Sequence, residues 1–325
     1  MTSTTRPAGL SQLNDRLFLT DSGLETTLIF RDHLDLPTFA AFVLLETDVG
    51  RRRLRSYFER HHAIARAHGA GFIAESPTWR ANADWGRTLG YDEAGLAAIN
   101  RAAISELADM RARCGETAET FVISGCLGPR HDGYAAQVRM SAAEAEHYHD
   151  AQIQTFADTP VDLVSALTIT YAEEAIGIVR AAVRMGLPVT ISFTVETNGR
   201  LPSGMTIEGA IRAVDAATDR GPAYYMINCA HPTHFSAPLC SGRLWPLRLR
   251  GLRANASRLS HAELDAAPTL DDGDPVELAM EYRELVNALP QLTILGGCCG
   301  TDHRHVAAIA DACADLYEPV RVRRG

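Results

Sequence analysis

The sequence predicts a single closed (β/α)8 barrel, and three observations lead to that fold class. Short and nearly continuous apolar runs recur along the chain, as expected for strands buried on both faces. Each run is followed by a stretch with helical spacing, or by a loop with room for a helix. The chain of 325 residues holds eight such units in succession, which is the pattern of a parallel barrel.

The predicted strands are rich in Val, Ile, Phe and Thr. They cover residues 17–24, 71–76, 120–126, 161–168, 188–194, 223–229, 245–251 and 292–299, and the seventh, WPLRLRG, is the weakest. A doubly wound open sheet is the alternative architecture. That fold would need a glycine fingerprint after the first strand, and the segment DSGLETTL found there is not G-x-G-x-x-G.

Capping residues mark where several of the intervening helices begin. Ser141 with Glu144 reads as a capping box, Thr206 precedes another helix, and Pro275 suits a first helical turn. The last helix is predicted from Asp302 toward Leu316. No linker, low-complexity segment or repeat beyond the βα unit is present, so residues 1–325 are predicted to form one barrel domain.

Composition narrows the class of protein. With 46% hydrophobic and 22% charged residues, the chain is neither disordered nor fibrous. A net charge of −9 argues against a nucleic-acid partner. The amino terminus lacks the apolar segment of a signal peptide, and no apolar run is long enough for a membrane span. An odd count of seven cysteines favours the reducing cytoplasm, where cysteines serve metal binding or catalysis.

The most informative segment is LGGCCGTDH, at the predicted end of the eighth strand. Cys298 and Cys299 are adjacent, so on a regular strand their side chains would point to opposite faces. The glycines around them, Gly296, Gly297 and Gly300, are expected to let both thiols turn toward one point.

A third cysteine, Cys229, closes the sixth strand in YYMINC, at the same end of the predicted barrel. Three converging thiolates suit Zn²⁺ and leave a fourth coordination position open. The alternative is that these are ordinary buried cysteines. His231 and His234 have ligand-like spacing near Cys229, but a role in loop structure is favoured for them.

Four segments in the same order, DSGLETTL, SGCLGP, INC and GGCCGT, resemble the homocysteine S-methyltransferases, a family that includes the betaine-dependent enzymes. The resemblance covers the chain from Asp21 to about Leu316. It implies a zinc-bearing barrel with Cys229, Cys298 and Cys299 as the metal ligands. It also implies a substrate pocket that includes Gly23, Leu24, Glu25, Glu75, Thr78, Trp79 and Asn228.

Zinc held by three thiolates is electron-rich and a poor Lewis acid, so a bound substrate sulfur stays nucleophilic. Such a sulfur can attack the methyl group of a sulfonium or a quaternary ammonium compound, and Trp79 could pack against that cation. The ligand set disfavours the alternative of a zinc hydrolase, whose metal usually carries histidine and carboxylate ligands.

One position departs from the family pattern. In the fourth strand of the family, a glutamate commonly helps to bind the amino group of the substrate, and the matching residue here is Leu167. Leucine cannot pair with an ammonium group. Glu25, Glu75 and Glu196 are the candidates for the missing carboxylate, and a different thiol acceptor is the alternative.

The sequence therefore predicts a zinc-dependent S-methyltransferase that acts on a small thiol, with homocysteine as the default acceptor and methionine as the product. The alternatives are a zinc-binding barrel with another acceptor, or one that has lost turnover. The expected partners are a small-molecule thiol and a diffusing methyl donor, without nucleic acid or membrane. Since no long arm follows the eighth helix, a monomer or a small homo-oligomer is expected.

Overall fold

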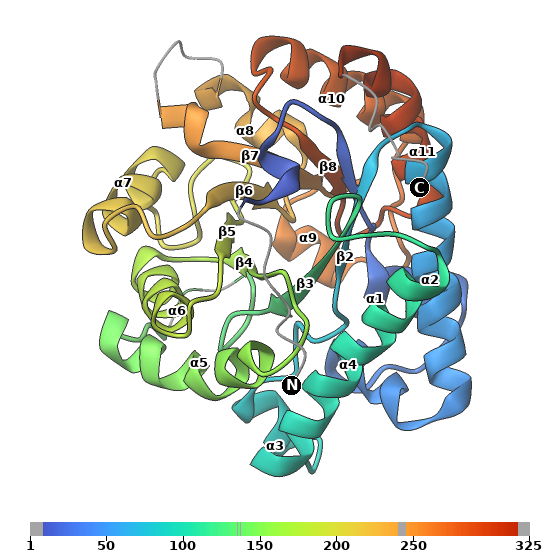
Figure 1. The fold of residues 1–325 in the computed structure, drawn as a ribbon. Helices are drawn as coiled ribbons and strands as arrows, with labels where there is room; N and C mark the ends of the chain where they lie inside the picture. The colour runs from blue at the N-terminus through green and yellow to red at the C-terminus, as the bar shows by residue number, and fades with distance from the viewer. Residues whose placement is uncertain (1–8, 135, 137, 240–244, 318–325) are drawn as a thin grey trace.

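The computed structural model describes residues 9–134, 136, 138–239 and 245–317. Its strands close into one barrel in the order β1 to β8, and every neighbouring pair is parallel (Figure 1). The strands are β1 (Phe18–Thr20), β2 (Gly71–Glu75), β3 (Phe121–Leu127), β4 (Leu163–Ile169), β5 (Val189–Phe193), β6 (Tyr224–Asn228), β7 (Leu249–Ala254) and β8 (Ile294–Gly297). The predicted (β/α)8 barrel is confirmed.

Helices surround the strands (Figure 1). They are α1 (Leu24–Thr26), α2 (Asp48–Ala67), α3 (Ala83–Thr88), α4 (Glu93–Arg113), α5 (Ala142–Ala157), α6 (Ala172–Arg184), α7 (Ile207–Ala217), α8 (Pro232–Leu239), α9 (His261–Ala266), α10 (Pro275–Ala288) and α11 (His303–Cys313). The capping signals are confirmed: Ser141 and Glu144 form a reciprocal capping box, Thr206 caps α7, and Pro275 opens α10.

The seventh strand begins later than the sequence predicted. Residues 245–248 form a 3-10 turn, and the strand runs over Leu249–Ala254 rather than 245–251. Pro246 explains part of the shift, because proline has no N–H to donate to a ladder. Residues 251–254 pair in register with β8, and Arg253 lies opposite Asn228 of β6. The shift therefore brings Arg253 to the carboxyl end of the barrel.

The two ends of the barrel interior differ in chemistry. Large apolar side chains fill the amino-terminal end, among them Phe18, Ile73, Val122, Leu163 and Ile294. Polar and sulfur-bearing side chains gather at the carboxyl ends of the strands, where the sites of this fold are found. The interior is therefore filled by apolar side chains at one end and lined by polar and sulfur-bearing ones at the other.

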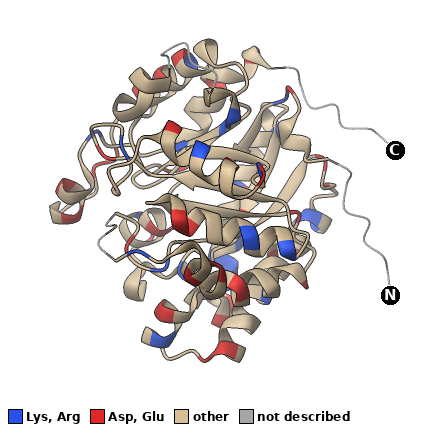
Figure 2. Ribbon diagram, turned by 90° about the vertical axis from the view of Figure 1, so that its left-hand side faces the viewer, with Lys and Arg blue, Asp and Glu red and all other residues tan. Residues whose placement is uncertain are grey.

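On the outside, basic and acidic residues alternate along the helices without a face of one sign in the view of Figure 2. This mixture agrees with the small excess of acidic over basic residues. Within the described ranges, no helix has both the length and the apolar character that a bilayer span requires.

Candidate metal centre and substrate pocket

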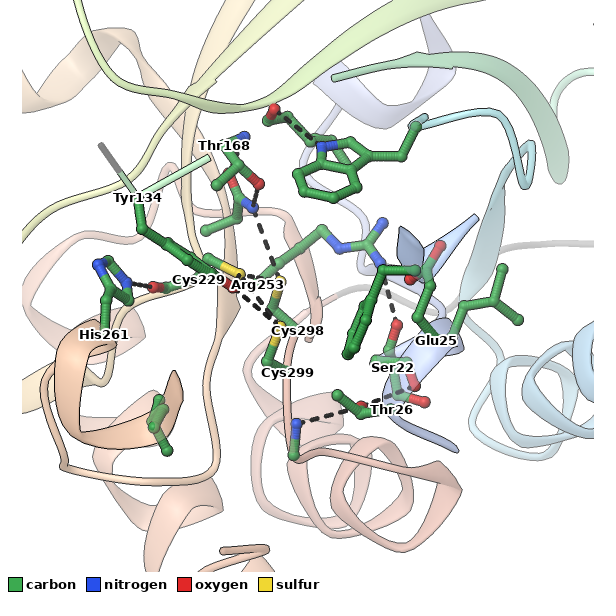
Figure 3. A pocket seen from close by; sticks show the side chains of 18 of the residues that line it. Ser22, Glu25, Thr26, Tyr134, Thr168, Cys229, Arg253, His261, Cys298 and Cys299 are labelled. Carbon is green, nitrogen blue, oxygen red and sulfur yellow. Dashed lines mark hydrogen bonds between the residues drawn. The ribbon is translucent and has the colours of Figure 1, made fainter. Parts of the chain in front are cut away.

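The three cysteines predicted as ligands come together at the mouth of the barrel (Figure 3). The Sγ atom of Cys229 lies 2.7 Å from that of Cys298 and 3.5 Å from that of Cys299. All three sulfurs lie within 4.8 Å of one another, and no other group of this kind occurs among the residues that the structure describes. Three soft sulfur donors around one point fit the ligand preference of Zn²⁺. We call these residues the cysteine cluster.

The backbone turns the thiols inward by a route that differs from the expected one. Cys229 itself has a φ of +56°, a left-handed conformation that is uncommon outside glycine. Of the three glycines near Cys298, only Gly300 has positive φ, at +79°. Gly296 and Gly297 belong to β8, and a Cβ on either would lie 1.9 Å or 2.1 Å from a threonine hydroxyl. They are needed for close packing, not for conformational freedom.

Asn228 connects the cysteine cluster to β4. Its Oδ1 accepts hydrogen bonds from the Thr168 N–H at 2.8 Å and from the Ser192 hydroxyl at 2.6 Å. Its Nδ2 donates to the Thr168 hydroxyl at 2.8 Å and lies 3.7 Å from Cys298 Sγ. Thr168 has a φ of +63°, where a β-branched residue is strained, and the pairing of β4 with β5 is irregular there. Asn228 thus links the strained Thr168 to Cys298.

Two residues that sequence reasoning missed complete the surroundings of the sulfurs. The Tyr134 hydroxyl lies 3.4 Å from Cys229 Sγ and 3.3 Å from Cys299 Sγ, and its ring stacks on His261 (Figure 3). His261 Nε2 donates to the Cys229 carbonyl at 2.6 Å. Both residues lie in segments between strands and outside any motif, so no sequence signal marked them.

The three thiols differ in acidity. Hydrogen bonds from Cys229 and Cys299, together with the nearby positive charge of Arg253, hold the pKa of Cys298 well below its usual range. The hydrogen bond to Cys298 raises the pKa of Cys229, and the contacts with Cys229 and Cys298 raise that of Cys299. Cys298 is therefore the thiol that ionises first.

The cysteine cluster lies in a cavity of about 360 Å³. Of the residues predicted for the substrate pocket, six line this cavity: Gly23, Leu24, Glu25, Glu75, Trp79 and Asn228. Leu167, at the position where the family carries a glutamate, also lines it. Burial raises the pKa of Glu25 to about 7, with smaller contributions from the charges of Asp21 and Cys298.

Thr78 is the exception and requires a correction. It is fully buried and is absent from the cavity wall. Its hydroxyl donates to the Cys126 carbonyl at 2.8 Å and lies 2.6 Å from the Ser76 hydroxyl. The side chain therefore joins the ends of β2 and β3 and lies outside the cavity wall as the described residues form it.

A buried group of charged residues forms another part of the cavity wall. Arg253 donates through Nε to the Gly297 carbonyl at 3.1 Å, and its Nη2 lies 2.9 Å from Asp21 Oδ1. Its Nη1 lies 3.8 Å from Glu75 Oε1. Burial raises the pKa values of Asp21 and Glu75, and the positive charge of Arg253 is the largest opposing influence on both. We call Asp21, Glu75 and Arg253 the charge cluster.

The two histidines with ligand-like spacing lie apart from the sulfurs. His231 contacts the Thr233 hydroxyl at 2.9 Å and the Glu281 carboxylate at 3.4 Å. His234 donates to the Arg258 carbonyl at 3.0 Å. Neither belongs to the cysteine cluster, in agreement with the favoured role in loop structure.

The fold and the cavity define a barrel enzyme with a thiol-rich centre at the carboxyl ends of its strands. The sequence model of the homocysteine S-methyltransferase family matches residues 18–313. The chain therefore belongs to this family of methyltransferases.

Individual relatives agree with the family assignment. The chain is 27% identical over 193 residues to betaine–homocysteine S-methyltransferase 1 of Rattus norvegicus; the match covers 54% of this chain and 45% of that protein, less than half its length. The homocysteine methyltransferase MmuM of Escherichia coli has the same fold. Its oxidized form superposes with a TM-score of 0.72 and its metallated form with 0.71, each at 20% identity over 92% of this chain and 96% of MmuM.

Proposed function

We propose that the protein is a zinc-dependent S-methyltransferase. It moves a methyl group from a small sulfonium or quaternary ammonium donor to a thiol, with homocysteine as the default acceptor and methionine as the product. The observation that carries this proposal is the convergence of three cysteine sulfurs, within 4.8 Å of one another, in the wall of a cavity large enough for a small substrate.

Cys229, Cys298 and Cys299 would hold the metal, and bound zinc would supply a deprotonated, nucleophilic acceptor sulfur. The residues around these cysteines hold the site in a fixed geometry through hydrogen bonds. Asn228 holds the strained Thr168 against the cluster, and His261 holds the carbonyl of Cys229. Rigid surroundings of this kind favour reaction by fixing both substrates in line.

The sequence suggested that Trp79 packs against the cation of the methyl donor, but the ring of Trp79 already has a cation beside it. The guanidinium of Arg80 already lies 4.7 Å from the centre of the Trp79 ring, and 3.7 Å from that of Trp85. One cation–π partner of Trp79 therefore comes from the chain itself. When ionised, Glu25 at the cavity wall is a better candidate for meeting the positive charge of a methyl donor.

We further propose that the chain acts as one barrel domain, as a monomer or a small homo-oligomer, in the cytoplasm. The support for a reducing compartment is that the six cysteines within the described residues are all free thiols.

A methyl-transfer assay tests the proposal. Zinc-loaded protein is incubated with homocysteine and, in turn, with S-methylmethionine, S-adenosylmethionine or betaine, and the methylated product is measured by mass spectrometry. We expect turnover with at least one donor, its loss on chelation and its return with added zinc. Absence of thiol methylation by fully loaded protein with every donor and with several thiols would rule out the proposed activity.

A further inference from the structure

Three atoms of the charge cluster are buried without a hydrogen bond among the described residues, and one of them, Asp21 Oδ1, already faces Arg253 Nη2 at 2.9 Å, which leaves two. Glu75 Oε2 and Arg253 Nη1 are both buried and have no hydrogen-bond partner among the described residues. Each side chain is only 5% exposed, and each residue lines the same cavity as the cysteine cluster. Buried polar atoms are rarely left unpaired, because each costs free energy of desolvation. A ligand in the cavity is the natural partner for them.

The two atoms differ in the partner they require. When the carboxylate is ionised, Glu75 Oε2 acts only as an acceptor of hydrogen bonds, whereas Arg253 Nη1 acts only as a donor. Asp21 adds a second carboxylate, so the ionised cluster has a net charge of (+1) − 2 = −1. A ligand with an ammonium group and a carboxylate on neighbouring atoms matches this arrangement. That pair of groups is the head of an α-amino acid.

The position of the charge cluster relative to the sulfurs supports this assignment. Arg253 is tied through Nε to the carbonyl of Gly297, the residue that immediately precedes Cys298. In Figure 3 the Arg253 side chain extends from the sulfurs toward Ser22 and Glu25. An amino acid whose sulfur lies at the cysteine cluster would therefore place its head, a short aliphatic spacer away, on the charged side of the cavity.

The other candidate carboxylates fit less well. Glu196 is absent from the cavity wall, its side chain is 33% exposed, and it faces His261 at 3.3 Å. Glu25 lines the cavity, but among the described residues no ion pair joins it to Arg253, so it is not part of a paired acceptor and donor that could meet both ends of an amino-acid head. Leu167 offers only an apolar side chain to the pocket.

We propose that Glu75 and Arg253 determine the specificity of this pocket for an amino-acid substrate. Glu75 Oε2 accepts from the substrate ammonium in place of the glutamate absent at Leu167, and Arg253 Nη1 donates to the substrate carboxylate. This inference rests on the proposed function, since it concerns the acceptor of the same site.

Binding of three thioethers tests the inference without requiring turnover. L-Methionine, 4-(methylthio)butanoate and 3-(methylthio)propylamine share one side chain, but the second lacks the ammonium and the third lacks the carboxylate. Calorimetry on the wild type should show methionine binding at least about 10-fold more tightly than either analogue, the effect of one charge-assisted hydrogen bond. In Glu75→Gln, the preference for methionine over 4-(methylthio)butanoate should collapse to within about threefold.

Matched variants decide between the carboxylates. Glu196→Gln is the control and should keep the wild-type preference. Arg253→Lys should reduce the preference for methionine over 3-(methylthio)propylamine, and its melting temperature shows whether it is folded. If Arg253→Lys does not fold, the Glu75→Gln result alone decides.

The inference would be overturned if Glu75→Gln kept the preference for methionine over 4-(methylthio)butanoate, or if Glu25→Gln lost it instead. Equal binding of all three compounds by the wild type would also overturn it. Failure of the proposed function has a different signature. Methionine would then bind with a preference that depends on Glu75, while zinc-loaded protein would methylate no thiol.

Discussion

The cysteine cluster and the charge cluster occupy the same cavity, yet they are built on different physical terms. The cysteine cluster lies at the ends of β6 and β8, and its members repel or share protons among themselves. The charge cluster lies at the ends of β1, β2 and β7, and its members balance one another through an ion pair of 2.9 Å and a longer one of 3.8 Å. The first group offers three sulfur donors that could hold a cation, whereas the second already pairs one guanidinium with two carboxylates.

Under the proposed function, the comparison teaches that this pocket separates chemistry from recognition. Soft sulfur donors serve the reacting atom, whereas buried carboxylates and a guanidinium suit the charged end of a substrate. Backbone contacts join the two groups: the Cys229 N–H donates to the Arg253 carbonyl at 3.1 Å, and Arg253 and Asp21 both bond to Gly297, the residue before Cys298. Substitutions on one side should therefore affect binding and stability differently from substitutions on the other.

The largest stability effect should come from Arg253→Met. This change leaves Asp21 and Glu75 as buried carboxylates without a counter-charge, which costs about 3–5 kcal/mol of the free energy of unfolding. Chemical denaturation measures the loss. Arg258→Met is the matched control, because Arg258 pairs with Glu277 and Glu281 at the surface and should cost less than about 1 kcal/mol. Equal losses in the two variants would show that the charge cluster does not stabilise the barrel.

Asn228→Ala should have the next largest effect. It removes the acceptor of the Thr168 N–H and of the Ser192 hydroxyl and releases a strained residue, at a cost of about 2–3 kcal/mol in stability. Because Asn228 also contacts Cys298, activity of the zinc-loaded enzyme should fall by roughly 10- to 100-fold. Asn198→Ala, in a surface loop, should change neither property. Normal activity in Asn228→Ala would show that Thr168 needs no such support.

His61, which lies behind the charge cluster, should give a smaller effect on stability, and this effect depends on pH. Burial lowers the pKa of His61 from 6.5 to about 4, and the ring contacts the Ser22 hydroxyl at 2.8 Å. Below pH 6.5 the unfolded chain takes up a proton at His61 that the folded protein refuses, so stability falls as pH drops from 6.5 toward 4. At pH 5 the loss is about 2 kcal/mol.

Unfolding of the wild type and of His61→Gln at pH 7.5 and pH 5 measures this contribution. The variant should be less stable at pH 7.5 but should lose about 2 kcal/mol less on acidification. An identical pH dependence in the two proteins would mean that His61 is already protonated in the fold.

The smallest expected effect is that of Leu167→Glu on activity. It tests directly whether the charge cluster supplies the carboxylate that is absent at this position. If Glu75 binds the substrate ammonium, Leu167→Glu should change kcat/KM for homocysteine by less than about threefold in the wild type. In a Glu75→Gln background the same change should restore roughly an order of magnitude, because a carboxylate again reaches the ammonium. 4-Mercaptobutanoate, which lacks the ammonium, is the control substrate. A large gain from Leu167→Glu in the wild type would show that the carboxylate is missing after all.

The sequence predicted the members of the cysteine cluster, but it did not predict the ion pairs of the charge cluster. Gly-Gly-Cys-Cys-Gly and a strand-ending Asn-Cys are local signals, so the fold and the convergence of the three cysteines were predictable from strand order alone. Arg253 was missed because the predicted seventh strand stopped at 251, and an arginine inside a barrel contradicts the apolar pattern used to find strands. Thr78 was misplaced because strand periodicity does not show which side of the following turn a hydroxyl faces. Buried charges depend on partners from distant strands, and no local pattern reports such partners.

Metal content is the most direct test of the central claim that Cys229, Cys298 and Cys299 hold one ion at the mouth of the barrel. Elemental analysis of the purified wild type should show one zinc per chain, while Cys229→Ala, Cys298→Ala and Cys299→Ala should each lose most of it. Cys114→Ala and Cys313→Ala, whose thiols belong to helix ends outside the cluster, should keep the wild-type content. Stoichiometric zinc in any of the three cluster variants, or its absence from a wild type refolded or dialysed with zinc, would contradict the account.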